Sequence, residues 1–432
     1  MTVARAFPYV RYNPDVAGDP GQLLAPPYDV IDAAQREELA QRSPYQSVLL
    51  ELPADDDAAG AAALLQQWIE DDVLELGEVG VAVVQQRYVG PDGVRRTRIG
   101  VLCEAEVSDF SEGRVQPHER TFSKPMLQRL ELMREVGANI SPVFLLYHDP
   151  SCALSDVLAP ATDHAPDFTA TEGDGTQTAV WFVTDLAVCE AIRAAIDPHP
   201  LLIADGHHRY TAAQTHLQQV RESAPHLALA PSGGESGMPI TSTSGPAGVL
   251  AFIANSAEPG ICVFPTHRIV TGADISTVDE FVLGSGAFRC DVHADVEDAM
   301  LQLEHLDVPG FVVHHQGRTR TFSLQDPLDI ELAAPEAGPA ARALDVTALH
   351  ALILDGGARL AEHSAGTTYS RSLDEALDIV AADATAIAFL MRPAPVDAIH
   401  EVAAAGELLP QKSTYFYPKV PTGVTFRLLS ME

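Results

Sequence analysis

The residues best suited to chemistry lie in one short run, Leu201 to Ala213, where an apolar strand leads into a charged turn and then a helical pattern. Asp205 ends the strand, Gly206 permits a tight turn, and the helix begins one or two residues later. The first turn of a helix presents unpaired N–H groups and a positive dipole end, which together attract anions. We therefore predict a phosphate-binding turn; a capped strand–turn–helix with surface histidines is the alternative.

The side chains of this turn suit a bound phosphate. Arg209 offers a guanidinium for bidentate contact with phosphate. His207 and His208 can donate hydrogen bonds to phosphoryl oxygens or transfer protons. Asp205 can hold Mg²⁺ that bridges the phosphates. Together with Gly206, these residues are the predicted phosphate-binding set, with Asp205 as the metal ligand and both histidines as candidate catalytic groups.

A second candidate site is the segment PHERT, where His118, Glu119 and Arg120 place a base, a carboxylate and a cation next to one another. Glu119 is the predicted general base that takes a proton from a substrate hydroxyl, and His118 would orient it. Arg120 is a predicted substrate ligand. A helix-entry cap with a surface ion pair is the alternative.

A third candidate lies near the end of the sequence printed above. Only three residues are lysines, Lys124, Lys412 and Lys419, and two of them fall within eight residues of each other. Lys412 with Ser413 and Thr414 is a predicted cradle for a phosphate or a substrate carboxylate. An aromatic strand with solvated lysines is the alternative.

Composition excludes several classes of function. The 432 residues carry 60 Asp and Glu against 27 Lys and Arg, a net charge of −33. Nucleic acids and anionic lipid surfaces need clustered cations, so we expect neither as a partner. There is no apolar run of 18 residues, no secretory h-region, and no paired cysteine pattern among the five cysteines. We therefore expect a cytoplasmic protein, with a homodimer left open.

Strand and helix signals alternate along the chain, which predicts an α+β (mixed α/β) fold. Asp32 is a predicted N-cap, Gly90 to Gly93 a predicted hairpin turn, and Gly137 a predicted helix end. Two stretches, 223–248 and 326–346, are predicted loops because they are rich in Pro, Gly or small residues. The predicted organisation is an N-terminal α/β region (1–225), a flexible linker or loop (226–248) and a C-terminal α/β region (249–432).

Six separated segments carry a resemblance to a known family: APPYDVI, PHERT, ANISPVF, IADGHHRYTAA, FPTHRIV and LPQKSTYFYPK. In this order they resemble the domain of unknown function 1015 family over nearly the whole chain. The DGHHR turn is similar to that of the ParB/sulfiredoxin-like superfamily, in which a variant of this turn binds nucleotide phosphates. Members with the DGHHR form include free-serine kinases, which phosphorylate L-serine with ADP or ATP.

The resemblance implies a ParB/sulfiredoxin-like core with an additional C-terminal α/β region, and ATP or ADP with Mg²⁺ as cofactors. It implies a kinase that acts on a small hydroxylated metabolite, with L-serine as a candidate. One departure is that Met126 and Gln128 stand where the family pattern carries Lys and Asp. A nucleotide-binding regulatory protein without catalysis, and a small-molecule phosphatase with His207 or His208 as acid–base, are the alternatives.

Overall fold

The structure is a computed structural model that describes residues 4–223 and 245–429. The described residues form two compact units. Unit 1 draws on three segments, Met1–Gln116, Thr121–Cys262 and Tyr417–Glu432, and unit 2 on two, Pro117–Arg120 and Val263–Phe416. The chain passes between the units at both ends of Pro117–Arg120 and again within two short strands, β12 (Cys262–Phe264) and β19 (Tyr415–Tyr417).

These units divide the chain differently from the predicted regions. Most of the predicted linker, 226–248, lies outside the described residues. The strand that follows it, β11 (Gly248–Asn255), is buried along its whole length and lies inside the sheet of unit 1. A strand's neighbours in a sheet are set by burial and register, and position along the chain does not reveal them.

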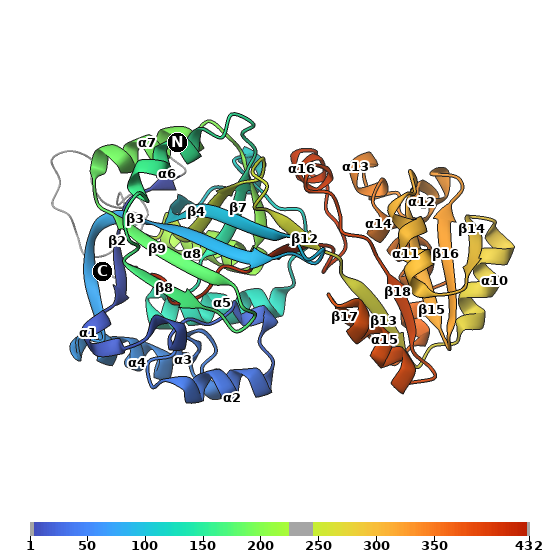
Figure 1. Ribbon diagram of the computed structural model, residues 1–432, viewed down its shortest axis with the longest axis horizontal. Helices are drawn as coiled ribbons and strands as arrows, with labels where there is room; N and C mark the ends of the chain where they lie inside the picture. The colour runs from blue at the N-terminus through green and yellow to red at the C-terminus, as the bar shows by residue number, and fades with distance from the viewer. Residues whose placement is uncertain (1–3, 224–244, 430–432) are drawn as a thin grey trace. The chain divides into compact units, whose positions relative to one another are not determined.

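Unit 1 is built on a mixed ten-stranded sheet (Figure 1). Its order is β5-β10-β7-β11-β4-β3-β9-β8, with β1 on β4 and β2 on β3. Parallel pairing joins β10 to β5 and β11 to β7; the other pairs are antiparallel. The strands are β1 (Ala4–Arg5), β2 (Phe7–Tyr12), β3 (Leu74–Val89), β4 (Arg95–Glu106), β5 (Val115–Gln116), β7 (Val143–Tyr147), β8 (Phe168–Thr171), β9 (Gln177–Val183) and β10 (Leu201–Asp205); a separate pair joins β6 (Ala138–Asn139) to β20 (Arg427–Leu428).

Helices cover both faces of this sheet, in two apolar cores. One core lies under α6 (Ala153–Ala161), α7 (Leu186–Ile196) and α8 (His207–Ser223). The other holds Trp68 and Leu132 from α4 (Ala58–Glu70) and α5 (Ser123–Val136). Shorter helices complete the unit: α1 (Pro14–Ala17), α2 (Ala33–Arg42) and α3 (Val48–Glu51).

Local signals in the sequence work well in unit 1. The Asp32 side chain accepts from the Gln35 N–H, and the Gln35 side chain returns a bond to the Asp32 N–H, so α2 begins with a capping box. Gly137 ends α5 in the left-handed conformation. The hairpin predicted around Gly90 joins β3 to β4. These predictions are confirmed.

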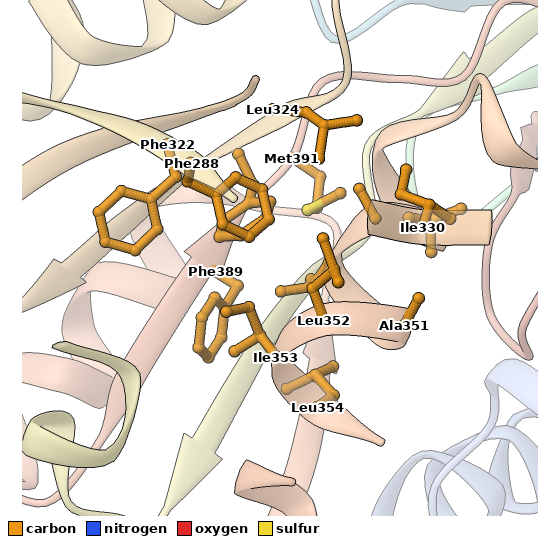
Figure 2. Packing of buried hydrophobic residues seen from close by; sticks show 14 of the residues in the cluster. Phe288, Phe322, Leu324, Ile330, Ala351, Leu352, Ile353, Leu354, Phe389 and Met391 are labelled. Atoms are coloured by element: carbon orange, nitrogen blue, oxygen red, sulfur yellow. The ribbon is translucent and has the colours of Figure 1, made fainter. Parts of the chain in front are cut away.

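Unit 2 is an antiparallel six-stranded sheet in the order β14-β16-β15-β18-β13-β17, with helices on both faces. Alternate residues point to opposite cores: Phe311 packs on one side and Val312 on the other. Figure 2 shows the larger core, where Phe288, Phe322 and Phe389 meet Met391 and Leu352. The strands are β13 (His267–Thr271), β14 (Phe288–His293), β15 (Gly310–His315), β16 (Arg318–Leu324), β17 (Gly366–Ser370) and β18 (Ile387–Leu390).

The predicted loop 326–346 is wrong in part, because this segment contains three short helices. They are α12 (Leu328–Ala333), α13 (Pro339–Arg342) and the start of α14 (Asp345–Leu349). Ile330 and Ala341 are fully buried in the larger core, so tertiary burial stabilises helices that Pro and Gly made improbable locally. The other helices are α10 (Ile275–Ser285), α11 (Val296–Glu304), α15 (Leu373–Ala382) and α16 (Val396–Ala404), with a π-helical turn at His350–Leu354.

The α+β prediction is confirmed in both units. Across 4–223 and 245–429, no helix combines the length and apolar character needed to cross a membrane.

Candidate functional site

The predicted phosphate turn forms as a strand–turn–helix in unit 1. β10 ends at Asp205, Gly206 has φ +89°, and α8 begins directly at His207. The Asp205 carboxylate accepts a hydrogen bond from Arg209 Nη2 at 2.7 Å on one oxygen and from Lys419 Nζ at 2.5 Å on the other. Arg209 and Lys419 are both buried, with about 8% of their surface exposed. We call Asp205, Arg209 and Lys419 the Asp205 clamp.

Electrostatics keep this clamp ionised. Burial alone would raise the pKa of Asp205, but the charges of Lys419 and Arg209 lower it to about 2. His207 behaves in the opposite sense, because burial lowers its pKa to about 3 and leaves a neutral imidazole at physiological pH. The neighbouring His208 accepts the Phe122 N–H on Nε2 at 3.0 Å, which ties the start of α8 to the start of α5.

Arg209 and a second arginine, Arg129, lie near the same aromatic ring, that of Tyr28. Its Nη1 donates to the Pro142 carbonyl, and its guanidinium lies 5.9 Å from the Tyr28 ring centroid. Arg129, from α5, lies over the same ring at 4.3 Å. Arg129 Nη1 donates to the Glu51 carbonyl at 2.9 Å and lies 3.5 Å from the Glu51 carboxylate. Two guanidiniums therefore flank Tyr28.

The sheet face beside the clamp carries a further buried cation. Phe144 is the register partner of both Asp205 and Phe252, and the Arg98 guanidinium stacks 4.5 and 5.0 Å from the Phe144 and Phe252 ring centroids. Gln86 links Arg98 to the clamp: it accepts from Arg98 Nη2 and donates to the Lys419 carbonyl at 3.0 Å. Burial lowers the pKa of Arg98 to about 10.

Unit 2 brings the other two predicted sites together. The Glu119 carboxylate accepts from the backbone N–H of Ser413 at 3.1 Å and of Thr414 at 3.3 Å, and from the Thr414 hydroxyl at 3.3 Å. His118 Nε2 lies 2.8 Å from Thr414 Oγ1 and 3.9 Å from Glu119 Oε1. PHERT and KST, nearly 300 residues apart in sequence, thus form one cluster that orients the Glu119 carboxylate.

The remaining predicted residues of unit 2 lie around this cluster. Lys412 has a positive φ of 58°, and its carbonyl accepts from buried Arg268 at 3.0 Å. The Ser413 hydroxyl donates to the Pro410 carbonyl at 2.5 Å, so it supports the turn. Arg120 is exposed.

The six sequence segments of the resemblance therefore gather in two places. Unit 1 joins APPYDVI, ANISPVF and IADGHHR with Lys419, through Tyr28, Pro142 and the Asp205 clamp. Unit 2 joins PHERT, FPTHRIV and QKST through Glu119 and Arg268. The segment that holds Lys412 and Lys419 contributes to both units, so the two lysines predicted as neighbours serve different units.

Sequence reasoning missed Arg129, Arg98 and the bond from Lys419 to Asp205. The helix that contains Arg129 also contains Met126 and Gln128, and the sequence resemblance singles out only these two residues. Arg98 gave no signal, since it lies in a strand with the neighbouring arginines Arg95 and Arg96. In the described part of the chain, no group of three or more His, Cys, Asp and Glu side chains is arranged to hold a metal ion.

Comparison with known proteins identifies the family. The sequence matches, over residues 4–347, the family described as "Protein of unknown function (DUF1015)". The chain belongs to the DUF1015 family. No curated protein matches it.

Eight chains of solved structures are similar to this DUF1015 protein. A conserved hypothetical protein from Pyrococcus furiosus is 14% identical with a TM-score of 0.38, over 76% of this chain and 95% of that one. A free serine kinase in complex with AMP is 13% identical with a TM-score of 0.36, over 75% and 92%. SbnI with a C-terminal truncation, from Staphylococcus aureus, is 9% identical with a TM-score of 0.37, over 76% and 87%.

Proposed function

We propose that this DUF1015 protein is a nucleotide-dependent phosphotransferase that acts on a small hydroxylated metabolite, with L-serine as the first acceptor to test. The observation that carries the proposal is the Asp205 clamp at the start of α8. Two buried cations, Arg209 and Lys419, share one carboxylate beside a helix N-terminus. In a chain with a net charge of −33, such an excess of buried positive charge favours an anionic ligand, and phosphoryl groups suit both cations.

Within this proposal Asp205 positions the two cations, and Arg209, Lys419 and the first N–H groups of α8 bind the phosphates of ATP or ADP. Neutral His207 would donate one hydrogen bond. Phosphoryl transfer depends mainly on such positioning and charge neutralisation. In the transfer, the acceptor hydroxyl loses its proton to a base as its oxygen bonds to phosphorus and the bond to the nucleotide breaks; Glu119 is the residue that we propose for this role from its residue type.

The donors around Asp205 do not fit a directly bound Mg²⁺. Both carboxylate oxygens already accept from cations, and a divalent ion would need Lys419 or Arg209 to leave. We therefore assign no step to a metal on Asp205, and Lys419 supplies the positive charge there. Mg²⁺ is proposed only as the ion that accompanies the nucleotide in solution.

The direct test is calorimetric titration of the full chain with ATP and with ADP in the presence of Mg²⁺. We expect binding to the wild type and at least a tenfold loss of affinity in Arg209→Ala. Arg221→Ala is the matched control, because Arg221 lies on the same helix and is exposed. Absence of binding to the wild type, or undiminished binding by Arg209→Ala, would contradict the proposal.

A transfer assay then separates the kinase from its alternatives. With L-serine and a panel of hydroxylated metabolites, we expect phosphorylated product that Glu119→Gln reduces at least a hundredfold in kcat. Nucleotide binding without transfer to any acceptor would favour a regulatory protein. Phosphate release from O-phosphoserine without nucleotide would favour a phosphatase.

A further inference from the structure

Unit 1 contains a small, partly polar cavity next to the Asp205 clamp. Its volume is about 40 Å³, and its polar lining residues are Arg129, Arg209, Glu51, Ser141 and Asn139. The rest of the lining is apolar and includes Leu132, Met133, Ile140, Ala212 and Val249. A cavity of this size holds about three water molecules or one group of similar bulk.

The two arginines that line this cavity, Arg129 and Arg209, have N–H groups without a hydrogen-bond partner in the described part of the chain. Among the described residues, the Nε atoms of Arg129 and Arg209 are buried and have no hydrogen-bond partner. Arg209 is more than nine-tenths buried. A buried guanidinium N–H without a partner is unfavourable, because no hydrogen bond in the protein replaces the one that it makes with water. Such donors indicate that an acceptor belongs in the cavity.

The charges around the cavity also favour a bound acceptor group. Three cations, Arg129, Arg209 and Lys419, are held here against two buried carboxylates, Asp205 and Glu51. The Ser141 hydroxyl donates to Glu51 at 2.8 Å, so Glu51 is already provided with donors. Asp29, beside Tyr28, is exposed to solvent, where screening weakens its charge, but that charge still acts on Arg209. Without Asp29, the five charged groups named above carry one positive charge in excess.

We propose that this cavity binds the carboxylate of the phosphoryl acceptor, with Arg129 and Arg209 as its ligands. A carboxylate carries one negative charge, has three heavy atoms, and matches the planar fork of a guanidinium. A phosphate is bulkier and more highly charged, and the cavity is small for it. The apolar lining suits the carbon next to the carboxylate. The acceptor is thus a small hydroxy acid or hydroxy amino acid.

Arg209 connects this subsite to the clamp. Its Nη2 bonds to Asp205 and the same residue lines the cavity, so Arg209 belongs to both the proposed carboxylate subsite and the proposed phosphate site. An acceptor anchored by its carboxylate would present its hydroxyl within a few ångströms of the phosphates, which is the positioning that phosphoryl transfer requires. This inference rests on the proposed function for the identity of the ligand, and its test is arranged to separate the two.

The experiment compares probes that differ only in the carboxylate. Glycolate is paired with ethylene glycol, and L-serine with 2-amino-1,3-propanediol, in NMR titrations of the full chain with and without ADP. We expect the two carboxylates to bind and the two neutral-ended partners to bind at least tenfold more weakly. Arg129→Lys, which keeps the charge but loses the fork, and Arg129→Met should each weaken carboxylate binding at least tenfold.

Arg134→Met is the matched control, since Arg134 lies exposed on the same helix, and it should bind carboxylates like the wild type. Failure of both carboxylates to bind, or wild-type affinity for carboxylates in both Arg129→Lys and Arg129→Met, would overturn the inference and leave a cavity that holds water only. Carboxylate binding that depends on Arg129 without any phosphoryl transfer would support the subsite and contradict the kinase. Transfer to both members of each pair with equal KM would support the kinase and contradict the subsite.

Discussion

At the scale of single residues, several cations of the described residues pair with buried or nearly buried carboxylates, among them Glu51, Glu104 and Asp205. Asp205 is held by two cations, and removal of one partner from a buried pair leaves an uncompensated charge. Such a loss typically destabilises a protein by about 3–5 kcal/mol, whereas loss of both partners is milder. Lys419 is therefore the most informative residue of the clamp.

We predict that Lys419→Met destabilises unit 1 by about 3 kcal/mol and weakens nucleotide binding at least tenfold. Chemical denaturation and calorimetric titration measure the two effects. Lys124→Met, at an exposed lysine of α5, should change neither. The double variant Asp205→Asn/Lys419→Met should be more stable than Lys419→Met alone; equal or lower stability would show that the pair does not interact.

His207 predicts a pH dependence of stability. Its pKa is about 3 in the folded protein, because it is buried, against 6.5 when unfolded. Between these values the unfolded chain binds a proton that the folded chain does not, so stability falls by up to about 1.4 kcal/mol per pH unit as pH drops from 6.5 towards 3. The pKa of Asp205 is about 2 in the folded protein against 3.8 when unfolded, so its contribution to stability is complete above pH 3.8 and is lost only as the pH falls from 3.8 towards 2.

His207→Gln should flatten this acid limb, which urea denaturation at intervals between pH 7 and 4 would measure. An unchanged slope in the variant would mean that other groups carry the pH dependence. His363→Gln is a suitable control, because His363 is an exposed residue of unit 2.

Residue types alone indicated Asp205, Arg209 and Glu119 as chemical candidates, because strand–turn–helix and base-plus-carboxylate patterns are local. Arg129 and Arg98 were not predicted as site residues, because their importance comes from burial and from aromatic neighbours such as Tyr28 and Phe144. Burial of a single arginine has no local sequence signal. The roles of the candidates as ligands and base stay predictions.

At the scale of elements, one turn determines how the clamp is made. Gly206 has φ +89°, a conformation that side chains with a Cβ rarely adopt, and a Cβ there would lie 3.0 Å from Arg209 Nε and Nη2. The turn therefore needs glycine for two reasons, backbone conformation and the close approach of Arg209.

We predict that Gly206→Ala destabilises unit 1 by about 1–2 kcal/mol and also weakens nucleotide binding, because Arg209 must move. Gly113→Ala is the matched control: Gly113 has φ +69° in the same unit, but no atom lies within 4 Å of its Cβ position. It should lose similar stability and keep nucleotide affinity. Equal nucleotide affinity in both alanine variants would show that the Gly206 turn does not contribute to nucleotide binding.

Elements with local signals were predicted well, and elements that depend on distant partners were not. The α2 capping box and the β3–β4 hairpin follow from residues close in sequence. In the segment from Lys412 to Lys419, for which an aromatic strand is the alternative prediction, only Tyr415–Tyr417 is a strand, and each end bonds to a different unit. No local pattern reveals such a division.

At the scale of the whole molecule, each unit has its own buried ion pair. In unit 1, Arg427 Nε donates to fully buried Glu104 at 2.8 Å. In unit 2, Arg392 Nε donates to Asp345 at 2.7 Å and its Nη atoms donate to three carbonyls. The two pairs allow the stability of the units to be perturbed separately.

We predict that Arg427→Met lowers the stability of unit 1 by about 3–5 kcal/mol and leaves the unfolding transition of unit 2 in place. Differential scanning calorimetry measures both transitions. Arg392→Met is the reciprocal control and should move only the other transition. A single transition that shifts as a whole in both variants would show that the units unfold together.

The return of the chain to unit 1 after residue 416 has a consequence for biosynthesis. Every residue of unit 2 is translated before Lys419 and Arg427, which belong to unit 1. Domains usually fold in the order of synthesis, N-terminal first. Here unit 1 is completed only after unit 2 has been translated, so until then Asp205 lacks Lys419 and Glu104 lacks Arg427.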